Sequence, residues 1–212
     1  MDVRGSVAVI TGAASGIGRE LALALADRGA TGLALVDRSD AIGGVAEEIR
    51  GRYAGLQAMP YVGDVADESF RQQVFQNIQG VMGTPSLCIP AAGIAQPNHL
   101  TVRLDKETGA PMLYPNELLD QTFQINTVAC CYWAMELIAG IAVDRKKRGL
   151  GRWTLSEREE GVVVLIGSIF SRGARGQLAY AISKGALTAA AGTLRKEGIH
   201  FGVRCGLVHP GF

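Results

Sequence analysis

The chain has 212 residues, of which 48% are hydrophobic and 19% are charged, a composition that can fill one sizeable core and predicts a single domain over residues 1–212. A net charge of +1 gives no reason to expect a nucleic acid or an anionic membrane surface as partner, and no apolar run reaches the length of a membrane span. The N-terminus lacks the basic and apolar regions of a signal peptide, so we expect a cytoplasmic protein.

A glycine-rich turn follows the first apolar stretch. Residues Ser6–Ile10 are apolar without alternation, which is typical of a buried parallel strand. The turn contains Gly12, Gly16 and Gly18, and an alanine- and leucine-rich helix is predicted from Gly16 to Arg28. Such glycines allow a tight bend and a close approach of backbone to pyrophosphate, and the helix N-terminus offers free N–H groups. The stretch predicts a dinucleotide-binding turn, although an ordinary strand–helix turn would also explain the glycines taken alone.

An acidic residue ends the second predicted strand. This strand covers Gly32–Val36, and Asp37 follows it directly. A carboxylate at that place can accept hydrogen bonds from both adenosine ribose hydroxyls, and it repels a 2′-phosphate. We therefore expect NAD rather than NADP as the cofactor, with the qualification that the neighbouring Arg38 could bind that phosphate.

Predicted strands and helices alternate along the rest of the chain. Further strands are predicted at Leu56–Val62, Ser86–Ile89, Gly161–Ile166 and Gly202–Val208. Further helices are predicted at Ala41–Tyr53, at Asp67–Gln79 with Asp67 as the cap, at Pro115–Arg148 with Pro115 in the first position, and at Gln177–Glu197. This alternation predicts right-handed βαβ units and an α/β fold whose parallel sheet is covered by helices on both faces.

Two segments interrupt the alternation, and we expect both to be surface excursions. The first is Gln96–Tyr114, in which residues 105–109 are predicted to form a turn. The second is Asp144–Glu160, which begins with the basic run 145–148. A solvated helix end, favoured by the helix dipole, explains this run better than a binding patch does.

The metal-ligating residue types show no metal-site spacing. The chain has four cysteines and three histidines, at Cys88, Cys130, Cys131, Cys205, His99, His200 and His209. None of the cysteines forms a Cys-x-x-Cys pair, so we expect no metal site and interpret the cysteines as reduced, mostly buried thiols.

A tyrosine and a lysine lie one helical turn apart near the start of the last predicted helix. Tyr180 and Lys184 share a helix face, and an ammonium beside a phenol lowers the tyrosine pKa from its usual value of about 10. Tyr180 is therefore a candidate general acid or base. Ser168 follows the preceding strand, at the carboxyl edge of the sheet where ligands of such folds bind.

Taken together, these motifs resemble those of the short-chain dehydrogenase/reductase family over essentially the whole chain. The cofactor turn of the family is matched by residues 11–18, with Gly12, Ser15, Gly16, Ile17 and Gly18. Other matches are the adenine-contacting pair Asp64 and Val65, the turn residues Ala92 and Gly93, the catalytic residues Asn126, Ser168, Tyr180 and Lys184, and the nicotinamide-covering pair Pro210 and Gly211. The resemblance implies a Rossmann-like doubly wound sheet with strand order 3-2-1-4-5-6.

The resemblance also implies a mechanism. Tyr180 would take the proton of a substrate hydroxyl, and Ser168 would hold that oxygen. Lys184 would lower the tyrosine pKa and bind the nicotinamide ribose, which makes Tyr180 and Lys184 cofactor contacts as well. Asn126 would help to hold a water that links the lysine to solvent. The implied activity is hydride transfer between NAD(H) and a secondary alcohol or ketone.

Several of these residues could instead have a purely structural role. Ser168 could merely cap a turn, and Ser171 could take its place in the mechanism. Asn126 could bond backbone within its own helix, and Asp64 could be an N-terminal helix cap.

The sequence also departs from the family pattern. Where the family has Asn-Asn-Ala-Gly, this chain has Pro90-Ala-Ala-Gly93, and we expect a looser turn. The chain stops at Phe212, so the lid and the seventh strand of the family are absent from it. Truncation and degeneration could each explain this end, and we favour truncation because the catalytic residues are intact.

The sequence is compatible with two functions of different classes. The favoured one is an NAD-dependent dehydrogenase or reductase with a small-molecule alcohol or ketone as substrate. The alternative is a non-catalytic NAD(H)-binding sensor or interaction protein of the same fold. In either case we expect a homodimer or homotetramer through the helices at 115–148 and 177–197, without a nucleic acid or membrane partner.

Overall fold

The computed structural model describes residues 2–211. Six parallel strands form the main sheet, in the order β3-β2-β1-β4-β7-β8. Their bounds are β1 Val7–Thr11, β2 Gly32–Asp37, β3 Gln57–Val62, β4 Leu87–Pro90, β7 Gly161–Ile166 and β8 Val203–Val208. Strands β5 Val102–Leu104 and β6 Pro111–Leu113 form a separate antiparallel hairpin. With the hairpin set aside, this is the predicted order 3-2-1-4-5-6, so the fold-class prediction is confirmed.

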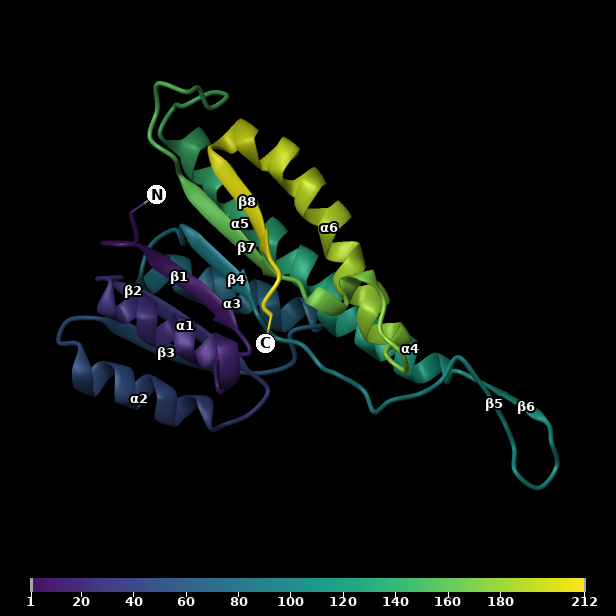
Figure 1. Cartoon of the computed structure of the whole chain (residues 1–212). Coiled ribbons are helices and arrows are strands. Elements are labelled where there is room, and N and C mark those ends of the chain that lie inside the picture. The colour runs from purple at the N-terminus through teal and green to yellow at the C-terminus, as the bar shows by residue number, and fades with distance from the viewer. Residues whose placement is uncertain (1, 212) are drawn as a thin grey trace.

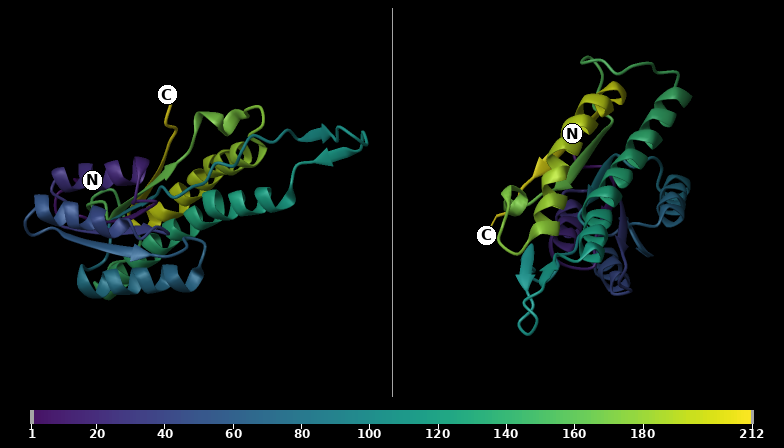
Figure 2. Two further views of the ribbon diagram at one scale, coloured as in Figure 1. Left: turned by 90° about the horizontal axis from the view of Figure 1, so that it is seen from below. Right: turned by 90° about the vertical axis from the view of Figure 1, so that its right-hand side faces the viewer.

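Helices cover both faces of the sheet (Figures 1 and 2). Their bounds are α1 Gly16–Asp27, α2 Ile42–Arg52, α3 Glu68–Val81, α4 Asn116–Phe123, α5 Cys130–Lys147 and α6 Leu178–Gly198. Short 3₁₀ turns lie at Ile169–Arg172 (η2) and Ile199–Phe201 (η3). The caps follow local chemistry, since the side chain of Asp67 accepts a hydrogen bond from the Phe70 amide at 2.9 Å, as predicted. Pro115 is the N-cap of α4 rather than its first helical residue.

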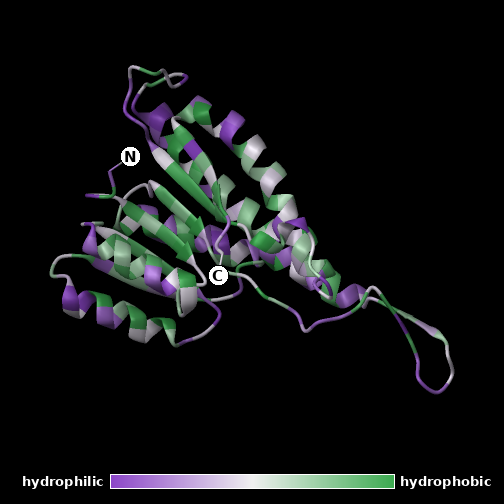
Figure 3. Cartoon of the chain, in the orientation of Figure 1, coloured by the Kyte–Doolittle hydropathy of each residue, from purple (hydrophilic) through white to green (hydrophobic). Residues whose placement is uncertain are grey.

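Two apolar cores sandwich the sheet because successive strand residues point to opposite faces. In β1, Val7 and Val9 belong to the core beneath α3, α5 and α6, whereas Ala8 and Ile10 belong to the core beneath α1 and α2. Figure 3 shows the strands as predominantly hydrophobic. Burial on both faces explains why the strands are apolar without alternation.

The long helix predicted at 115–148 is interrupted by a π-helical segment, η1 at Gln124–Ala129, which joins α4 to α5. By length and composition the continuous helix Asn116–Lys147 could also cross a membrane, contrary to the expectation that no stretch could. Its buried residues Trp133, Leu137 and Ile141 pack in the core of the sheet, so that part of its apolarity serves the fold.

The first excursion, between β4 and α4, is the hairpin β5–β6, and it stands away from the body of the molecule in the views of Figure 2. All residues of both strands are exposed. The predicted turn at 105–109 is its tip, where Asp105 accepts hydrogen bonds from the amides of Glu107 and Thr108. The base is joined to the body by a hydrogen bond from the His99 amide to the Gly176 carbonyl.

The second excursion departs from its prediction. The basic run at 145–148 is not uniformly solvated, because Arg145 is only 1% exposed. Its guanidinium binds Glu157 and Glu160, each at 2.8 Å, and these residues lie beyond the end of α5. The predicted solvated helix end is therefore wrong for Arg145, which instead fixes the 148–160 loop to α5.

Candidate active site

A cleft of about 450 Å³ opens at the carboxyl ends of the first four strands. Its walls come from the segments that follow β1, β2, β3 and β4, together with two residues of the α4–η1 helix. The lining residues are Gly12, Ser15, Gly16, Ile17, Gly18, Asp37, Arg38, Gly63, Asp64, Val65, Ala91, Ala92, Gly93, Ile94, Gln121 and Ile125. Because β1 lies between β2 and β4, the cleft sits at the switch point where α/β folds bind dinucleotides.

Two glycines of the first turn are required by its geometry. Gly12 has a φ of +69°, and a Cβ on it would lie 2.7 Å from the Cα of Ala92. A Cβ on Gly18 would lie 2.2 Å from the carbonyl oxygen of Gly12. The turn, the start of α1 and the loop after β4 are therefore packed backbone to backbone. This close packing leaves the amino end of α1 open to the cleft, where its free N–H groups can bind phosphate oxygens.

Asp37 holds the glycine turn as well as lining the cleft. One carboxylate oxygen accepts a hydrogen bond from the Ala14 amide at 3.0 Å, and the other accepts one from the Ser39 amide at 3.0 Å. Each carboxylate oxygen has a further lone pair, so Asp37 can still accept bonds from a diol. Arg38 lines the same cleft. Asp64 is exposed and accepts a hydrogen bond from the Ala66 amide at 2.8 Å.

The loop after β4 is firmly bonded, so the expected looser turn is not found. The Ala92 amide donates to the hydroxyl of Thr11 at 3.1 Å. Ile94 is bonded at both backbone groups to the Asn126 amide, through its N–H at 2.8 Å and its carbonyl at 2.9 Å. These bonds come from β1 and from η1.

Asn126 connects three elements at the π-helical segment. It is fully buried. Besides its two bonds to Ile94, its Nδ2 donates to the Ser183 hydroxyl at 3.2 Å, and that hydroxyl donates to the Tyr180 carbonyl at 2.8 Å. Thr127 adds a bond from its hydroxyl to the Ser183 carbonyl at 2.9 Å. The side chain thus bonds the β4 loop and α6 rather than its own helix, and it fixes the first turns of α6 relative to the cleft.

Lys184 lies behind the cleft wall. A Cβ on Gly93 would lie 3.6 Å from the lysine Nζ and 3.1 Å from Oδ1 of Asn126. The Nζ donates to the carbonyl of Ile166 at 2.8 Å and lies 6.0 Å from the centroid of the Tyr180 ring. Burial lowers the pKa of the Lys184 ammonium, because an apolar surrounding disfavours the charged form. The amine is therefore placed next to both the cleft and the tyrosine.

Ser168 and Tyr180 both contact Phe170 of the η2 turn. Tyr180 is half-buried, and its ring meets that of Phe170 edge-on at 6.5 Å. The Ser168 hydroxyl accepts a bond from the Phe170 amide at 3.1 Å, so it does cap the η2 turn. Accepting that bond leaves the hydroxyl proton free to donate to a substrate oxygen. Ser171, the alternative, lines a separate hollow of about 500 Å³ next to the hairpin base.

The structure thus groups the predicted residues in two sets. The predicted cofactor residues from the turns after β1, β2, β3 and β4 all line the cleft. The remaining predicted residues do not line it, namely Asn126, Ser168, Tyr180, Lys184, Pro210 and Gly211. Of these, Asn126 and Lys184 approach the cleft at Gly93. In the part of the chain that the structure describes, no group of three metal-ligating side chains could hold an ion.

Several site residues escaped the sequence analysis. Gln121 and Ile125 line the cleft from one helix face, and their i, i+4 spacing beside Asn126 was the available signal. His209 contacts the backbone of Ser168 through its Nδ1 at 2.9 and 3.1 Å. No pattern in the sequence indicates this contact, because the two residues end different strands.

The chain is similar in sequence to known proteins. A family model described as short chain dehydrogenase matches residues 6–212. A 3-oxoacyl-acyl-carrier-protein reductase from Bos taurus is 29% identical over 208 residues, which cover 97% of this chain and 75% of the relative. A 2,3-dihydro-2,3-dihydroxybenzoate dehydrogenase from Bacillus subtilis is 26% identical over 210 residues, covering 99% and 70%.

A solved structure is also similar in fold. It is a short-chain type dehydrogenase/reductase from Mycobacterium marinum, with a TM-score of 0.79 and 25% identity, and the match covers 100% of this chain and 74% of that one.

Proposed function

Because the chain belongs to the short-chain dehydrogenase/reductase family, whose members are oxidoreductases that use a nicotinamide dinucleotide, we propose that it interconverts a secondary alcohol and a ketone with NAD(H). One observation carries the proposal. A Cβ placed on Gly93, which lines the cleft, would come within contact distance of Lys184 Nζ and Asn126 Oδ1. This proximity supports a single site made of the nucleotide cleft and the tyrosine–lysine pair.

The chain's residues suit such a cofactor. Gly12 and Gly93 both line the cleft, and their neighbours pack so closely that a Cβ on either would press against them. The amino end of α1 would bind the pyrophosphate, Asp37 would accept the adenosine ribose hydroxyls, and Val65 would lie against the adenine. The preference for NAD rests on Asp37. When bound, the cofactor supplies the redox chemistry, and the protein supplies position and electrostatics.

The protein's own part in the reaction is proton transfer and orientation. Tyr180 takes the proton from the substrate hydroxyl during oxidation and returns it during reduction. Ser168 donates its free hydroxyl proton to the substrate oxygen and stabilises the charge that develops there. Lys184 holds the nicotinamide ribose, and Asn126 keeps the start of α6 in place through Ser183.

The class of substrate is a further part of the proposal. The bovine relative is a 3-oxoacyl reductase by name, and the bacterial relative is a dihydrodiol dehydrogenase by name. Both names describe chemistry at a secondary carbinol or its ketone. We therefore propose 3-hydroxyacyl/3-oxoacyl compounds and cyclic secondary alcohols as the first substrates to test.

The deciding experiment combines binding with turnover. NADH and NADPH are titrated by fluorescence, and both substrate classes are assayed with wild type and Tyr180→Phe. We expect NADH to bind both proteins and only the wild type to turn over. If NADH binds but no secondary alcohol or ketone reacts, the protein is a cofactor-binding sensor instead. If neither nucleotide binds, the proposed function is wrong.

We also propose a homo-oligomer through the long helix and α6. Tyr132 and Met135 on α5 are 47% and 40% exposed, and Ile182 on α6 is 46% exposed. Apolar side chains on helix faces outside the core are typical of subunit contacts. Light scattering would measure the mass in solution, and a monomer would contradict this proposal.

A further inference from the structure

A second hollow lies at the opposite edge of the sheet from the cleft. Its volume is about 600 Å³. It is lined by the last turns of α5, by residues 150–152 of the following loop, and by His200 and Phe201 of η3. The loop leads into β7, and η3 leads into β8 (Figure 1). The hollow therefore lies at the amino ends of these strands, whereas the cleft lies at the carboxyl ends of strands. It is not part of the proposed active site.

The lining of this hollow combines positive charge with apolar surface. Arg145, Lys146 and Arg152 contribute the charge, and none of the described residues that line it is acidic. Three apolar residues that line it are unusually exposed, namely Val143 at 53%, Leu150 at 40% and Phe201 at 37%. Cations beside exposed apolar side chains suit a ligand with an anionic group and an apolar part.

Two buried nitrogens in the lining residues have no partner. They are Nε of Arg145 and Nδ1 of His200, and within residues 2–211 neither makes a hydrogen bond. A buried polar group without a partner is costly, so such groups usually have a ligand, an ion or a water to complete them. Arg145 is 1% exposed and lines the hollow, which makes its Nε a donor held in place without an acceptor.

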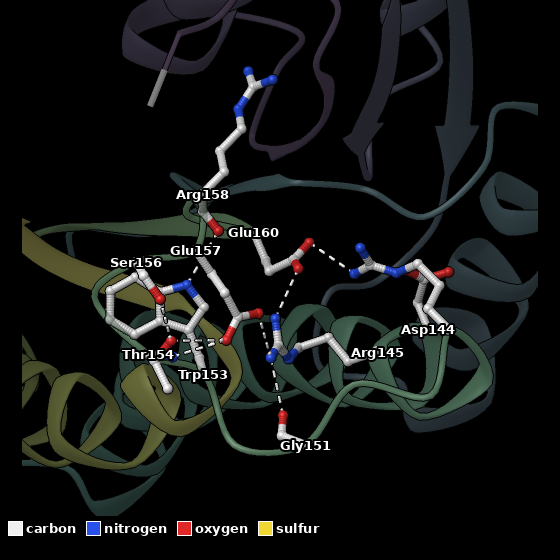
Figure 4. Close-up of polar contacts among 10 residues, drawn as sticks. Asp144, Arg145, Gly151, Trp153, Thr154, Ser156, Glu157, Arg158 and Glu160 are labelled. Atoms are coloured by element: carbon white, nitrogen blue, oxygen red, sulfur yellow. Dashed lines mark hydrogen bonds and ion pairs between the residues drawn. The ribbon is translucent and has the colours of Figure 1, made fainter.

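The other atoms of the Arg145 guanidinium explain why it is rigid (Figure 4). Nη1 donates to Glu160 at 2.8 Å, and Nη2 donates to Glu157 at 2.8 Å and to the Gly151 carbonyl at 2.9 Å. The two glutamates balance the charge of Arg145 itself. The net attraction for an anion therefore comes from Lys146 and Arg152, which must also overcome the negative end of the α5 dipole.

We propose that this hollow binds an amphipathic carboxylate, that is, a carboxylate head on a single unbranched apolar chain. The head is attracted by the exposed cations Lys146 and Arg152. The chain lies against Val143, Leu150 and Phe201. A volume of about 600 Å³ lies within the range of small-molecule sites.

Calorimetric titration of the whole chain with octanoate tests the proposal, in the presence of saturating NADH so that the nucleotide part of the cleft is filled. Acetate supplies the head without the chain, and octanol supplies the chain without the charge. We expect octanoate to bind at least about tenfold more tightly than either, because both halves of the ligand are needed. We also expect its affinity to fall as salt is added.

Matched variants locate the binding. Lys146→Gln/Arg152→Gln removes two exposed cations from the lining and leaves the buried Arg145 intact, so the fold is preserved. Lys147→Gln removes an adjacent cation of the same helical turn that does not line the hollow. We expect the affinity for octanoate to fall at least about tenfold in the double variant, because both attractive charges are lost. In the control variant we expect the affinity to fall by less than about twofold. Absence of octanoate binding to the wild type, or equal affinity in the double variant, would overturn the proposal.

Discussion

The Nδ1 atom of His209 lies 3.1 Å from the backbone nitrogen of Ser168 and 2.9 Å from its carbonyl oxygen. The two residues are 41 positions apart, and the contact joins the chain after β8 to the chain after β7. A single ring nitrogen can accept from the amide when it carries no proton or donate to the carbonyl when it does, but not both. In either form it fixes the backbone that carries the proposed catalytic serine.

His209 should therefore act as a positioning residue. We expect His209→Leu to lower kcat by about 10- to 100-fold, because a small misplacement of a reacting group lowers the reaction rate by a factor of that size. NADH affinity should stay unchanged, since His209 does not line the cleft. His209→Asn offers an amide oxygen to the Ser168 N–H and should restore most of the loss. Steady-state kinetics with NADH titration checks this, and equal defects in both variants would contradict it.

The cofactor preference should depend on Asp37. Replacing it with alanine removes the charge that faces the ribose, and it also removes the bonds to Ala14 and Ser39. A charge-assisted bond contributes about 1.5–3 kcal/mol, so NADH should bind roughly 10- to 100-fold more weakly. The affinity for NADPH should fall less, because the repulsion between the carboxylate and the 2′-phosphate disappears as well.

Asp37→Asn is the matched control for this effect. It keeps one acceptor for the glycine turn, so a changed ratio of NADH to NADPH affinity in both variants would assign the preference to the charge. Fluorescence titration measures both constants. An unchanged ratio would show that Asp37 does not select the cofactor.

The packing of the glycine turn gives a test with an internal comparison. Gly12→Ala places a Cβ 2.7 Å from Ala92 Cα at a φ of +69°. The backbone must shift, and we expect the free energy of unfolding to fall by about 1–3 kcal/mol. We also expect the variant to lose NADH binding. Gly44→Ala, in α2, meets no atom within 4 Å and should stabilise the protein by up to about 1 kcal/mol. Thermal unfolding of both variants would show whether the loss of stability comes from the close approach of Gly12 to Ala92 or from any added methyl group.

Much of the fold could be predicted because its signals are local. Apolar strands, the glycine turn and the Asp67 cap each depend on a few neighbouring residues, and strand order followed from the family resemblance. The burial of Arg145 could not be predicted, since its partners Glu157 and Glu160 lie across a loop of irregular structure. The same holds for His209 and Ser168, whose contact depends on the pairing of β7 with β8.

The residues that line the cleft could also be predicted from the sequence. The residues directly after β1, β2, β3 and β4 line the cleft because parallel strands bring their carboxyl ends to one edge. The firm bonding of the β4 loop could not be predicted. It depends on Asn126, which lies in a different element and bonds the backbone of Ile94.

The Arg145 ion pairs predict a specific response to acid. The hydrogen bond from Arg145 holds the pKa of the Glu157 carboxyl below its usual value of 4.5. Since the folded pKa is the lower one, this contribution to stability is fully present above pH 4.5 and is lost as the pH falls through the folded value. Urea unfolding at several pH values should show this loss in the wild type.

Arg145→Met is the variant that checks the assignment. It leaves Glu157 and Glu160 without their buried cation, and we expect the free energy of unfolding to fall at neutral pH. Its stability should depend less steeply on pH between about 5 and about 3, because Glu157 then titrates near its usual value. Adding Glu157→Gln and Glu160→Gln should recover part of the loss, and an unaltered pH profile in Arg145→Met would contradict the assignment.

The π-helical turn at Gln124–Ala129 has a consequence for how this chain can vary in length. A π turn holds one residue more than the α-helix needs, and each residue of an α-helix advances it by about 100°. Thr122 before the turn and Trp133 after it are both fully buried. Deleting one residue here would rotate one half of the helix by about 100° and turn either the site or the core outward. The extra residue thus sets the angular phase between the half of the helix that carries Asn126 and the half that packs on the sheet.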